Sequence, residues 1–123
     1  MRLLLSALLA LLCIGPALSQ TTGPQAQPWI GRWYIEDPAV CKGPAGDTEG
    51  LLVYGPRTAE GYEYACDIAR AHRSGARTDI TLRCQAEGRT SIQKETVEVV
   101  DGRLRRTIKV EGKIRTGEYR RCP

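Results

Sequence analysis

Five dipeptides that end in glycine divide the second half of the chain into short segments. They are Glu60-Gly61, Ser74-Gly75, Glu87-Gly88, Asp101-Gly102 and Glu111-Gly112. Glycine readily adopts the positive φ that tight turns need, and the segments between these dipeptides alternate apolar with polar side chains. No window of the chain has a sustained helical periodicity. The pattern predicts an all-β fold, a small antiparallel up-and-down β-barrel of about 7–8 strands.

The alternation and the turn residues give the approximate limits of seven strands. Asp101-Gly102 is the strongest hairpin signal, because a two-residue type I′ turn needs positive φ at both positions. That turn places Glu98 opposite Arg105, which is a favourable pair of charges. Loops are expected at 38–47, 56–61 and 72–76. The predicted strands are 29–36, 49–54, 62–70, 77–85, 90–100, 103–110 and 113–122.

The first nineteen residues have the features of a signal peptide. Met1-Arg2 is a basic start, residues 3–14 are apolar, and Ala17-Leu18-Ser19 offers the small residues that a signal peptidase reads. The apolar run is too short for a stable membrane span. We therefore expect residues 1–19, with Cys13, to be removed and the protein to be periplasmic or extracellular. A flexible arm, 20–28, then precedes a single barrel domain, 29–123.

Four cysteines remain after the leader: Cys41, Cys66, Cys84 and Cys122. An even number of cysteines in an exported chain indicates two disulfides that stabilise a modest core. Cys84 and Cys122 each end a predicted strand, which favours the pairs Cys84–Cys122 and Cys41–Cys66. The alternative is Cys66–Cys84, since these two lie symmetrically about Gly75. The spacing does not suit zinc, so no metal or other cofactor is expected.

The segment Gly31-Arg32-Trp33-Tyr34 resembles the GxW signature that begins the first strand of calycins, which include lipocalins, avidins and a bacterial family of secreted metalloprotease inhibitors. The chain is also similar to short exported bacterial proteins with a GxW strand, four cysteines and a final aromatic-x-x-Cys. The resemblance implies that Gly31 and Trp33 lie at a closed end of a barrel. It also suggests that Arg106 stacks on Trp33, unless a bulge turns Arg106 outward. In the inhibitor family the segment ahead of the barrel enters the protease active site, which corresponds here to 20–28.

The sequence offers few residues in arrangements that support catalysis. The single histidine, His72, lies in a predicted turn among arginines, which suits a solvated loop better than a general base. The four cysteines are expected to be oxidised, so no thiolate is free for catalysis. Four carboxylates alternate with apolar residues and are expected to face solvent: Asp67, Asp79, Glu95 and Glu98. The sequence therefore predicts that the protein is not an enzyme.

Charge is distributed unevenly along the chain. Residues 103–123 hold eight basic and two acidic side chains, a net charge of +6, whereas residues 20–102 hold nine basic and twelve acidic ones, a net charge of −3. A cationic patch on the last hairpin would suit an anionic partner, although charged outer faces also keep strands from aggregating. The predicted patch comprises Arg103, Arg105, Lys109, Lys113, Arg115 and Arg121.

These features together predict an exported monomeric binding protein. The leading hypothesis is an inhibitor of an envelope or secreted hydrolase, a protease or a lysozyme, whose active site is blocked by the loops 38–47, 56–61 and 72–76 at one rim or by the arm 20–28. The alternatives are a lipocalin-like binder of a small ligand, and a structural envelope protein that binds an anionic surface through the basic hairpin. Nucleic acid is not an expected partner of an exported protein.

Overall fold

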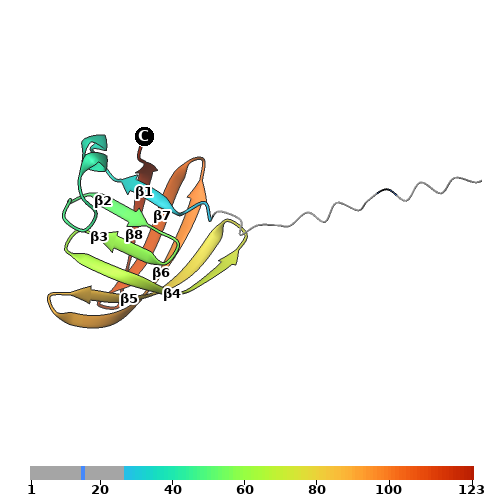
Figure 1. Cartoon of the computed structure of the whole chain (residues 1–123). Coiled ribbons are helices and arrows are strands. Elements are labelled where there is room, and N and C mark those ends of the chain that lie inside the picture. The colour runs from blue at the N-terminus through green and yellow to red at the C-terminus, as the bar shows by residue number, and fades with distance from the viewer. Residues whose placement is uncertain (1–14, 16–26) are drawn as a thin grey trace, which may run out of the picture.

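The computed structural model describes residue 15 and residues 27–123 (Figure 1). The predicted signal peptide, 1–19, and most of the predicted arm, 20–28, lie outside these residues. Among the described residues, no helix is long and apolar enough to cross a membrane.

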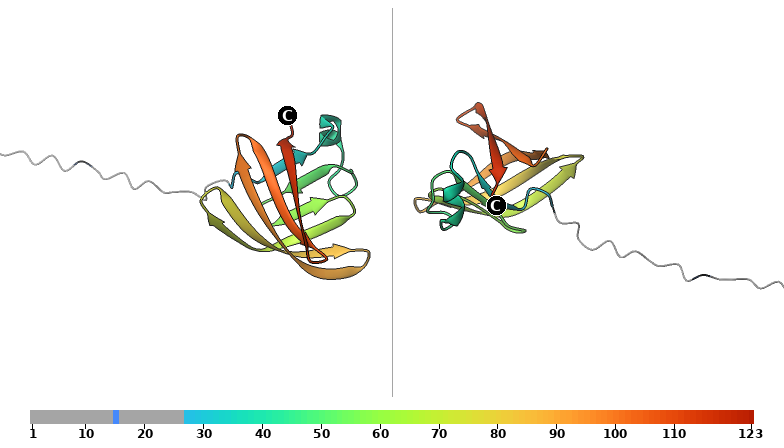
Figure 2. Two further views of the ribbon diagram at one scale, coloured as in Figure 1. Left: turned by 180° about the vertical axis from the view of Figure 1, so that it is seen from behind. Right: turned by 90° about the horizontal axis from the view of Figure 1, so that it is seen from above.

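Eight antiparallel strands form a closed barrel in which each strand pairs with the next and β8 pairs with β1 (Figures 1 and 2). This confirms the predicted all-β, up-and-down architecture. The one helical element in the described part of the chain is the 3-10 helix η1. The elements are β1 (Gly31–Tyr34), η1 (Pro38–Lys42), β2 (Leu51–Tyr54), β3 (Thr58–Gly61), β4 (Tyr64–Ser74), β5 (Arg77–Ala86), β6 (Arg89–Val100), β7 (Arg103–Val110) and β8 (Lys113–Arg121).

The tight turns after β5, β6 and β7 follow the sequence signals closely. Asp101 and Gly102 both have positive φ, 52° and 72°, as a type I′ hairpin requires. The same conformation recurs at the Glu87-Gly88 and Glu111-Gly112 turns. Glu98 lies opposite Arg105 in the register of β6 and β7, which confirms the predicted charge pair.

Two segments differ from the strand prediction. Thr58–Gly61 was expected to be a loop but forms the short strand β3, and the chain turns instead at residues 62–63, where Glu63 has a φ of 62°. The strand β4 continues to Ser74, beyond the predicted end, and stays paired with β5 as far as Arg77, past a bulge between Ile68 and Arg70. The extra strand brings the total to eight.

The extra strand also changes which loops share an end of the barrel. In an up-and-down barrel successive connections alternate between the two ends, so the 35–50 loop lies at the end opposite to the β4–β5 turn. The expectation that loops 38–47, 56–61 and 72–76 form one rim is therefore wrong. The loop 35–50 instead shares its end with the β3–β4 and β5–β6 turns, which Figure 1 shows on the same side of the barrel.

The disulfides are Cys41–Cys122 and Cys66–Cys84, so the favoured pairing was wrong and the alternative for Cys66 was right. Cys66 and Cys84 are direct neighbours across β4 and β5. Cys84 and Cys122 cannot meet, because β5 and β8 run in opposite directions and carry these residues to opposite ends of the barrel.

The helix η1 is held against β1, which brings Cys41 to Cys122. Arg32 donates hydrogen bonds to the carbonyl oxygens of Cys41 at 3.0 Å and Gly43 at 2.6 Å. The backbone amide of Cys122 donates to the carbonyl of Arg32 at 2.9 Å. The disulfide thus links β8 to η1 beside the seam at which the barrel closes.

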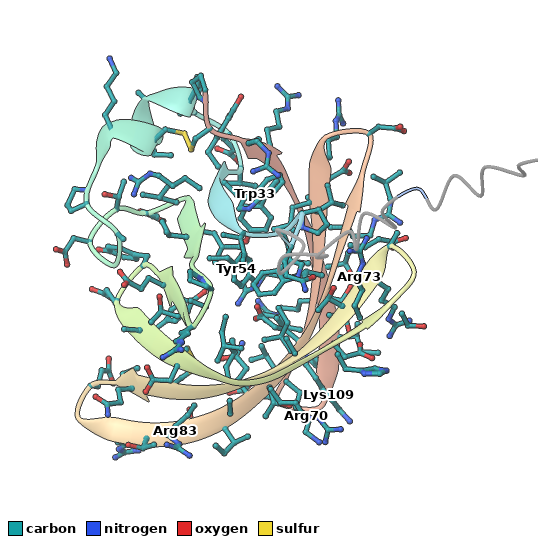
Figure 3. All side chains as sticks on the ribbon, turned by 45° about the vertical axis from the view of Figure 1, so that its right-hand side comes forward. Trp33, Tyr54, Arg70, Arg73, Arg83 and Lys109 are labelled. Atoms are coloured by element: carbon teal, nitrogen blue, oxygen red, sulfur yellow. A yellow bond between two sulfur atoms is a disulfide. The ribbon has the colours of Figure 1, made fainter. Side chains whose placement is uncertain are left out.

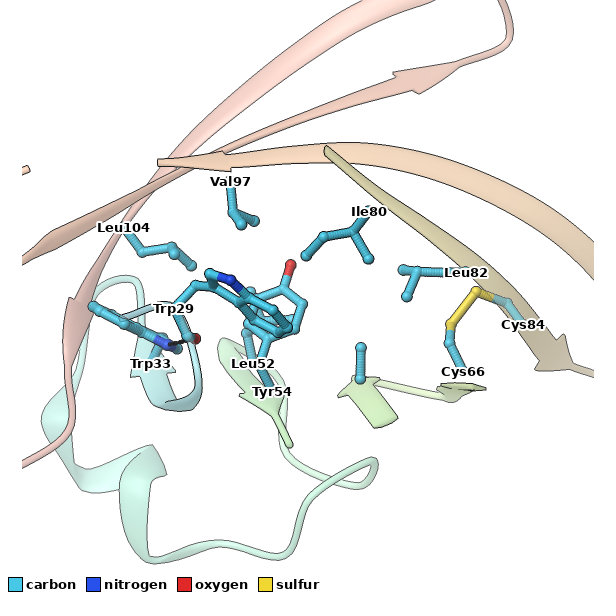
Figure 4. Close-up of a cluster of buried hydrophobic side chains, with 11 residues drawn as sticks. Trp29, Trp33, Leu52, Tyr54, Cys66, Ile80, Leu82, Cys84, Val97 and Leu104 are labelled. Carbon is cyan, nitrogen blue, oxygen red and sulfur yellow. Dashed lines mark hydrogen bonds between the residues drawn. A yellow bond between two sulfur atoms is a disulfide. The ribbon is translucent and has the colours of Figure 1, made fainter. Parts of the chain in front are cut away.

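Aromatic side chains fill the end of the barrel near β1 (Figure 4). Trp33 is fully buried, and its indole N–H donates to the carbonyl of Trp29 at 2.9 Å. Trp29 packs edge to face on Tyr54, with ring centroids 5.6 Å apart. The rest of the buried core comes from strands around the whole barrel: Leu52, Ala59, Cys66, Ile80, Leu82, Cys84, Val97 and Leu104.

The arginine that covers Trp33 is Arg121, and the expectation for Arg106 was wrong. The guanidinium carbon of Arg121 lies 4.2 Å from the centroid of the Trp33 ring. The same guanidinium donates to the carbonyls of Pro28 at 2.7 Å and Ile30 at 3.3 Å. The register explains this choice, because Arg121 lies directly opposite Trp33 in the β1–β8 pair.

Candidate functional site

A buried ion pair occupies the middle of the barrel. Arg106 donates two hydrogen bonds to Oε2 of Glu95, at 3.0 Å from Nε and 2.8 Å from a terminal nitrogen. Tyr54 donates to Oε1 of the same carboxylate, and Arg106 also donates to the hydroxyl of Tyr64 at 3.2 Å. The prediction that Glu95 faces solvent is wrong, since Glu95 alternates with Thr96 and Lys94 and lies on the same face as the buried Val97.

Burial and the charges of neighbouring side chains shift the pKa values within this network. Burial raises the pKa of Tyr54 well above its usual value, and the neighbouring Glu95 carboxylate raises it further. Burial also raises the pKa of Tyr64. Burial alone would lower the pKa of Arg106, but Glu95 and the two tyrosines more than offset it, so that pKa is raised. The raised pKa values keep both tyrosines protonated and Arg106 charged, and all four side chains are hydrogen-bonded, which suits a structural role better than proton transfer.

The predicted cationic patch does not form a single surface. In the β7–β8 register, Arg103 lies opposite Arg120 and Lys109 lies opposite Ile114, on the outer face together with Arg105. Lys113 and Arg115 lie opposite Val110 and Ile108, on the face that continues the barrel interior. Arg121 also points inward, over Trp33. The six residues are therefore divided between the two faces of the hairpin, because the prediction did not match the alternation of β7 to that of β8.

The structure instead gathers a different set of cations in a groove of about 510 Å³ across the outer face of β4 to β8. Its basic side chains are Arg70, His72, Lys94 and Lys109. Figure 3 shows Arg70 and Lys109 pointing away from the barrel on the same side of the sheet, with Arg83 further off along the sheet. Of the predicted patch, only Lys109 belongs to this groove.

Two rows of residues that follow the strand pairing form the floor and wall of the groove. Arg70, Thr81 and Lys94 are neighbours across β4, β5 and β6. The next row runs across all five strands and contributes mainly hydroxyl groups: His72, Asp79, Thr96, Thr107 and Thr116. The hydroxyls of Thr107 and Thr116 lie 3.2 Å apart. The groove thus combines positive charge with hydrogen-bonding groups and the exposed side chain of Ile114.

The acidic residues near the groove do not cancel its charge. Asp79 accepts a hydrogen bond from Thr96 at 2.8 Å and lies 3.5 Å from the guanidinium of Arg77. Glu95 points to the opposite face of the sheet, where Arg106 neutralises it. Arg70, Lys94 and Lys109 therefore give this groove a net positive charge.

A bulge places Arg70 and His72 in the groove, which is why sequence reasoning missed them. Strict alternation from Cys66 and Ile68 would point residue 70 into the barrel. The register shift between Ile68 and Arg70 reverses the alternation, so Arg70 and His72 pair with the outward-facing Thr81 and Asp79. The local sequence did give one signal, because a charged side chain in an apolar row indicates either a buried ion pair or a bulge.

A second groove, of about 580 Å³, has the opposite charge. It lies at the end where the 35–50 loop meets the β3–β4 and β5–β6 turns, and the amide of Glu63 donates to the carbonyl of Gly46 at 2.8 Å to hold the first two together. The charged residues that line it are Asp47, Glu60, Glu63 and Glu87. Within the described residues, no group of three or more histidine, cysteine, aspartate or glutamate side chains is placed to bind a metal ion.

No family model, no curated protein sequence and no solved structure matches the chain.

Proposed function

We propose that the protein is an exported binding protein that holds an anionic envelope polymer, most simply an acidic polysaccharide, in the outer groove of β4 to β8. The observation that supports this is the convergence of Arg70, Lys94 and Lys109 beside a row of threonine hydroxyls. Cations bind carboxylate or phosphate groups, and hydroxyls form hydrogen bonds with sugar hydroxyls. The two disulfides suit a protein that folds in an oxidising compartment.

The interior of the barrel supports recognition at the surface. Trp29, Trp33 and Tyr54 fill the end near β1, and the pair formed by Glu95 and Arg106 occupies the middle. A lipocalin-like ligand would have to displace these side chains and break a buried ion pair, at a cost of several kcal/mol. The proposal therefore places the ligand outside the barrel.

Binding to a defined acidic polysaccharide tests this function. Purified protein with both disulfides formed is titrated with polygalacturonate, with neutral dextran as the control polymer, in a calorimeter. We expect binding to polygalacturonate alone, and an affinity that falls as salt is added, because exposed charges are screened.

A groove variant and a control variant locate the site. Replacing both Lys94 and Lys109 with glutamine is expected to weaken binding by about tenfold or more, since each lost charge contact contributes on the order of 1 kcal/mol. Replacing Arg83, which is exposed on the same sheet but outside the groove, with glutamine is expected to leave the affinity within about twofold. An equal loss of binding free energy for each charge removed in the two variants would show that net charge, and not the groove, controls binding.

Inhibition of a secreted or envelope hydrolase remains the second candidate. The feature that favours it is the second groove, in which three separate loops meet at one end of a scaffold stiffened by two disulfides. Its carboxylates would complement a basic hydrolase such as a lysozyme. Assays against lysozymes and zinc proteases, with Glu63→Gln and Glu87→Gln together as the variant, test this candidate. No inhibition and no complex at high protein concentration would count against it.

A further inference from the structure

The hydrogen-bonded ladder between β6 and β7 stops before either strand ends. The two strands pair only from Val100 and Arg103 to Glu95 and Ile108. On its other side, β6 stays paired with β5 back to Arg89, and β7 stays paired with β8 out to Val110. The β5–β6 hairpin and the β7–β8 hairpin therefore separate at this point, as the right-hand view of Figure 2 shows.

Two like charges lie where the ladder ends. The register pairs Thr96 with Thr107, so one more outward pair would place Lys94 directly opposite Lys109. Two ammonium groups at that spacing on an exposed face repel each other. The strands part at the residue where this pair would form.

The separation leaves backbone groups without a strand partner. The type I′ turn at Asp101-Gly102 makes Val100 and Arg103 a hydrogen-bonded pair, and alternate residues of β6 then point their N–H and C=O groups toward β7. By this alternation, Ile92 and Lys94 of β6 and Lys109 of β7 direct these groups into the opening. Among the described residues, no strand pairs with them there.

The opening is a groove of about 510 Å³ bounded by residues 91–94 and 109–112. Apolar side chains beside it are unusually exposed: Ile92 by 62%, Ile114 by 73% and Val110 by 37%. Open strand edges next to exposed apolar side chains are the features of sheets that accept an added strand.

We propose that this opening binds an extended acidic segment of a partner protein as an additional strand along β6. Charge selects the occupant, because Arg89, Lys94, Lys109 and Lys113 are all exposed around the opening and Glu111 is the one acidic residue among those that line it. The same charges oppose a second copy of this chain, whose identical edge would bring the same cations together.

The register also specifies the pattern of the segment. A residue added opposite Lys94 points to the outer face and is acidic, and the residue two positions away faces Ile92 and is apolar. The backbone of the segment would complete the hydrogen bonds of Ile92 and Lys94. The inference concerns a strand edge and a protein partner, and so it does not depend on polysaccharide binding in the outer groove.

The probe is a ten-residue peptide, capped at both ends, whose odd positions alternate glutamate with valine and whose even positions are threonine, so that one face offers glutamate to Lys94 and valine to Ile92. Amide exchange of the protein is followed by NMR, with and without the peptide. We expect the amides of Ile92 and Lys94 to exchange at least about tenfold more slowly in the complex, because each becomes hydrogen-bonded to the added strand. The amides of Gln93 and Glu95, which already face β5, are expected to change little.

Two controls separate strand addition from attraction between charges. The same peptide with a central threonine replaced by proline keeps every glutamate but cannot pair along its length, so it is expected to give no protection. The variant Ile92→Pro removes one backbone donor from the opening and leaves every cation in place, and it is expected to weaken peptide binding at least about tenfold. If Ile92→Pro does not fold, the proline peptide alone still decides the outcome.

The peptide experiment gives different results if strand addition occurs and if it does not. Protection of Ile92 and Lys94 by the alternating acidic peptide, and not by its proline version, supports strand addition. Equal binding of both peptides, binding without protection of these amides, or no binding would overturn it. Polygalacturonate binding would survive that failure, because it requires the side chains of the outer groove and not the strand edge.

Discussion

The two ends of the sheet formed by β6, β7 and β8 differ, because one is covered by other side chains and the other is open to solvent. At the end near β1, Arg121 covers Trp33, two indoles and Tyr54 pack together, and the Cys41–Cys122 disulfide links β8 to η1. At the other end the ladder stops at Glu95, and Ile92 and Ile114 lie in solvent. The comparison indicates that folding stability is concentrated at one end, which leaves the other free to present unpaired edges and charge.

Loss of the buried ion pair between the two ends is expected to have the largest effect. The change Arg106→Met leaves the fully buried Glu95 carboxylate without its partner and is expected to cost about 3–5 kcal/mol of unfolding free energy. Denaturant titration measures it. The double variant Arg106→Met with Glu95→Leu is expected to be more stable than the single one, and an equal or greater loss would contradict the ion-pair explanation.

Removing the Cys41–Cys122 disulfide is expected to lower the free energy of unfolding almost as much as the Arg106→Met change does. In the chain-entropy model a loop of 81 residues is worth about 4.5 kcal/mol and one of 18 residues about 3 kcal/mol. Replacing Cys41 and Cys122 with alanine should therefore lower the denaturation midpoint more than replacing Cys66 and Cys84. The reverse order would show that the β4–β5 hairpin, and not the seam at β1, limits stability.

Alkaline pH is expected to weaken the barrel through Tyr54. Its folded-state pKa is raised by burial above the ordinary value of 10.0, so the unfolded chain loses this proton first as the pH rises. Stability from this group is complete below pH 10 and then falls, by at most about 1.4 kcal/mol per pH unit. Thermal unfolding between pH 8 and about 11.5 measures the slope, and Tyr54→Phe should reduce it. An unchanged pH dependence of thermal unfolding in Tyr54→Phe would show that other groups cause the loss of stability at alkaline pH.

The contact of Arg121 with Trp33 is expected to contribute less to the free energy of unfolding than the features above. The change Arg121→Gln removes a cation–π contact and charged hydrogen bonds to the carbonyls of Pro28 and Ile30, which together are worth about 1–2 kcal/mol. The matched control is Arg120→Gln, which alters an exposed side chain on the opposite face of β8 and should cost less than about 0.5 kcal/mol. Chemical denaturation of both variants tests the difference.

Relieving the lysine repulsion at the open end is expected to have the smallest effect, and one of opposite sign. Replacing Lys94 and Lys109 with threonine removes two like charges and adds a favourable cross-strand pair, which should stabilise the ladder by about 0.5 kcal/mol. Slower amide exchange at Lys94's position and at Ile92 would show that β6 and β7 have paired further. Unchanged exchange there would mean that the strands separate because of sheet coiling and not because of charge.

Features that depend on local residue patterns were predictable from the sequence. The Asp101-Gly102 and Glu111-Gly112 turns and the pairing of Glu98 with Arg105 follow from turn chemistry and period-two alternation. The barrel architecture follows from the same signals repeated along the chain. Trp33 in the GxW segment was correctly placed in the buried end.

Features that depend on register across several strands were not predictable. The bulge after Ile68 decides that Arg70 faces the outer groove, and the one local signal, a charged residue in an apolar row, does not distinguish a bulge from a buried ion pair. The short strand β3 changes how the ends alternate, which separated the expected rim loops. The Cys84–Cys122 pair is excluded independently of β3, because β5 and β8 are three strands apart and run in opposite directions. Choosing between Arg106 and Arg121 as the cover of Trp33 required knowing which strand lies beside β1.

The two disulfides also differ in the order in which they can form. Cys66 and Cys84 belong to one hairpin, so their thiols meet as soon as β4 and β5 pair. Cys41 meets Cys122, 81 positions further along the chain, only when β8 docks beside β1. A chain entering an oxidising compartment amino-terminus first therefore keeps the thiol of Cys41 available to incorrect partners during its entry. Cys41 is thus the position at which a thiol-disulfide isomerase would most affect the yield of folded protein.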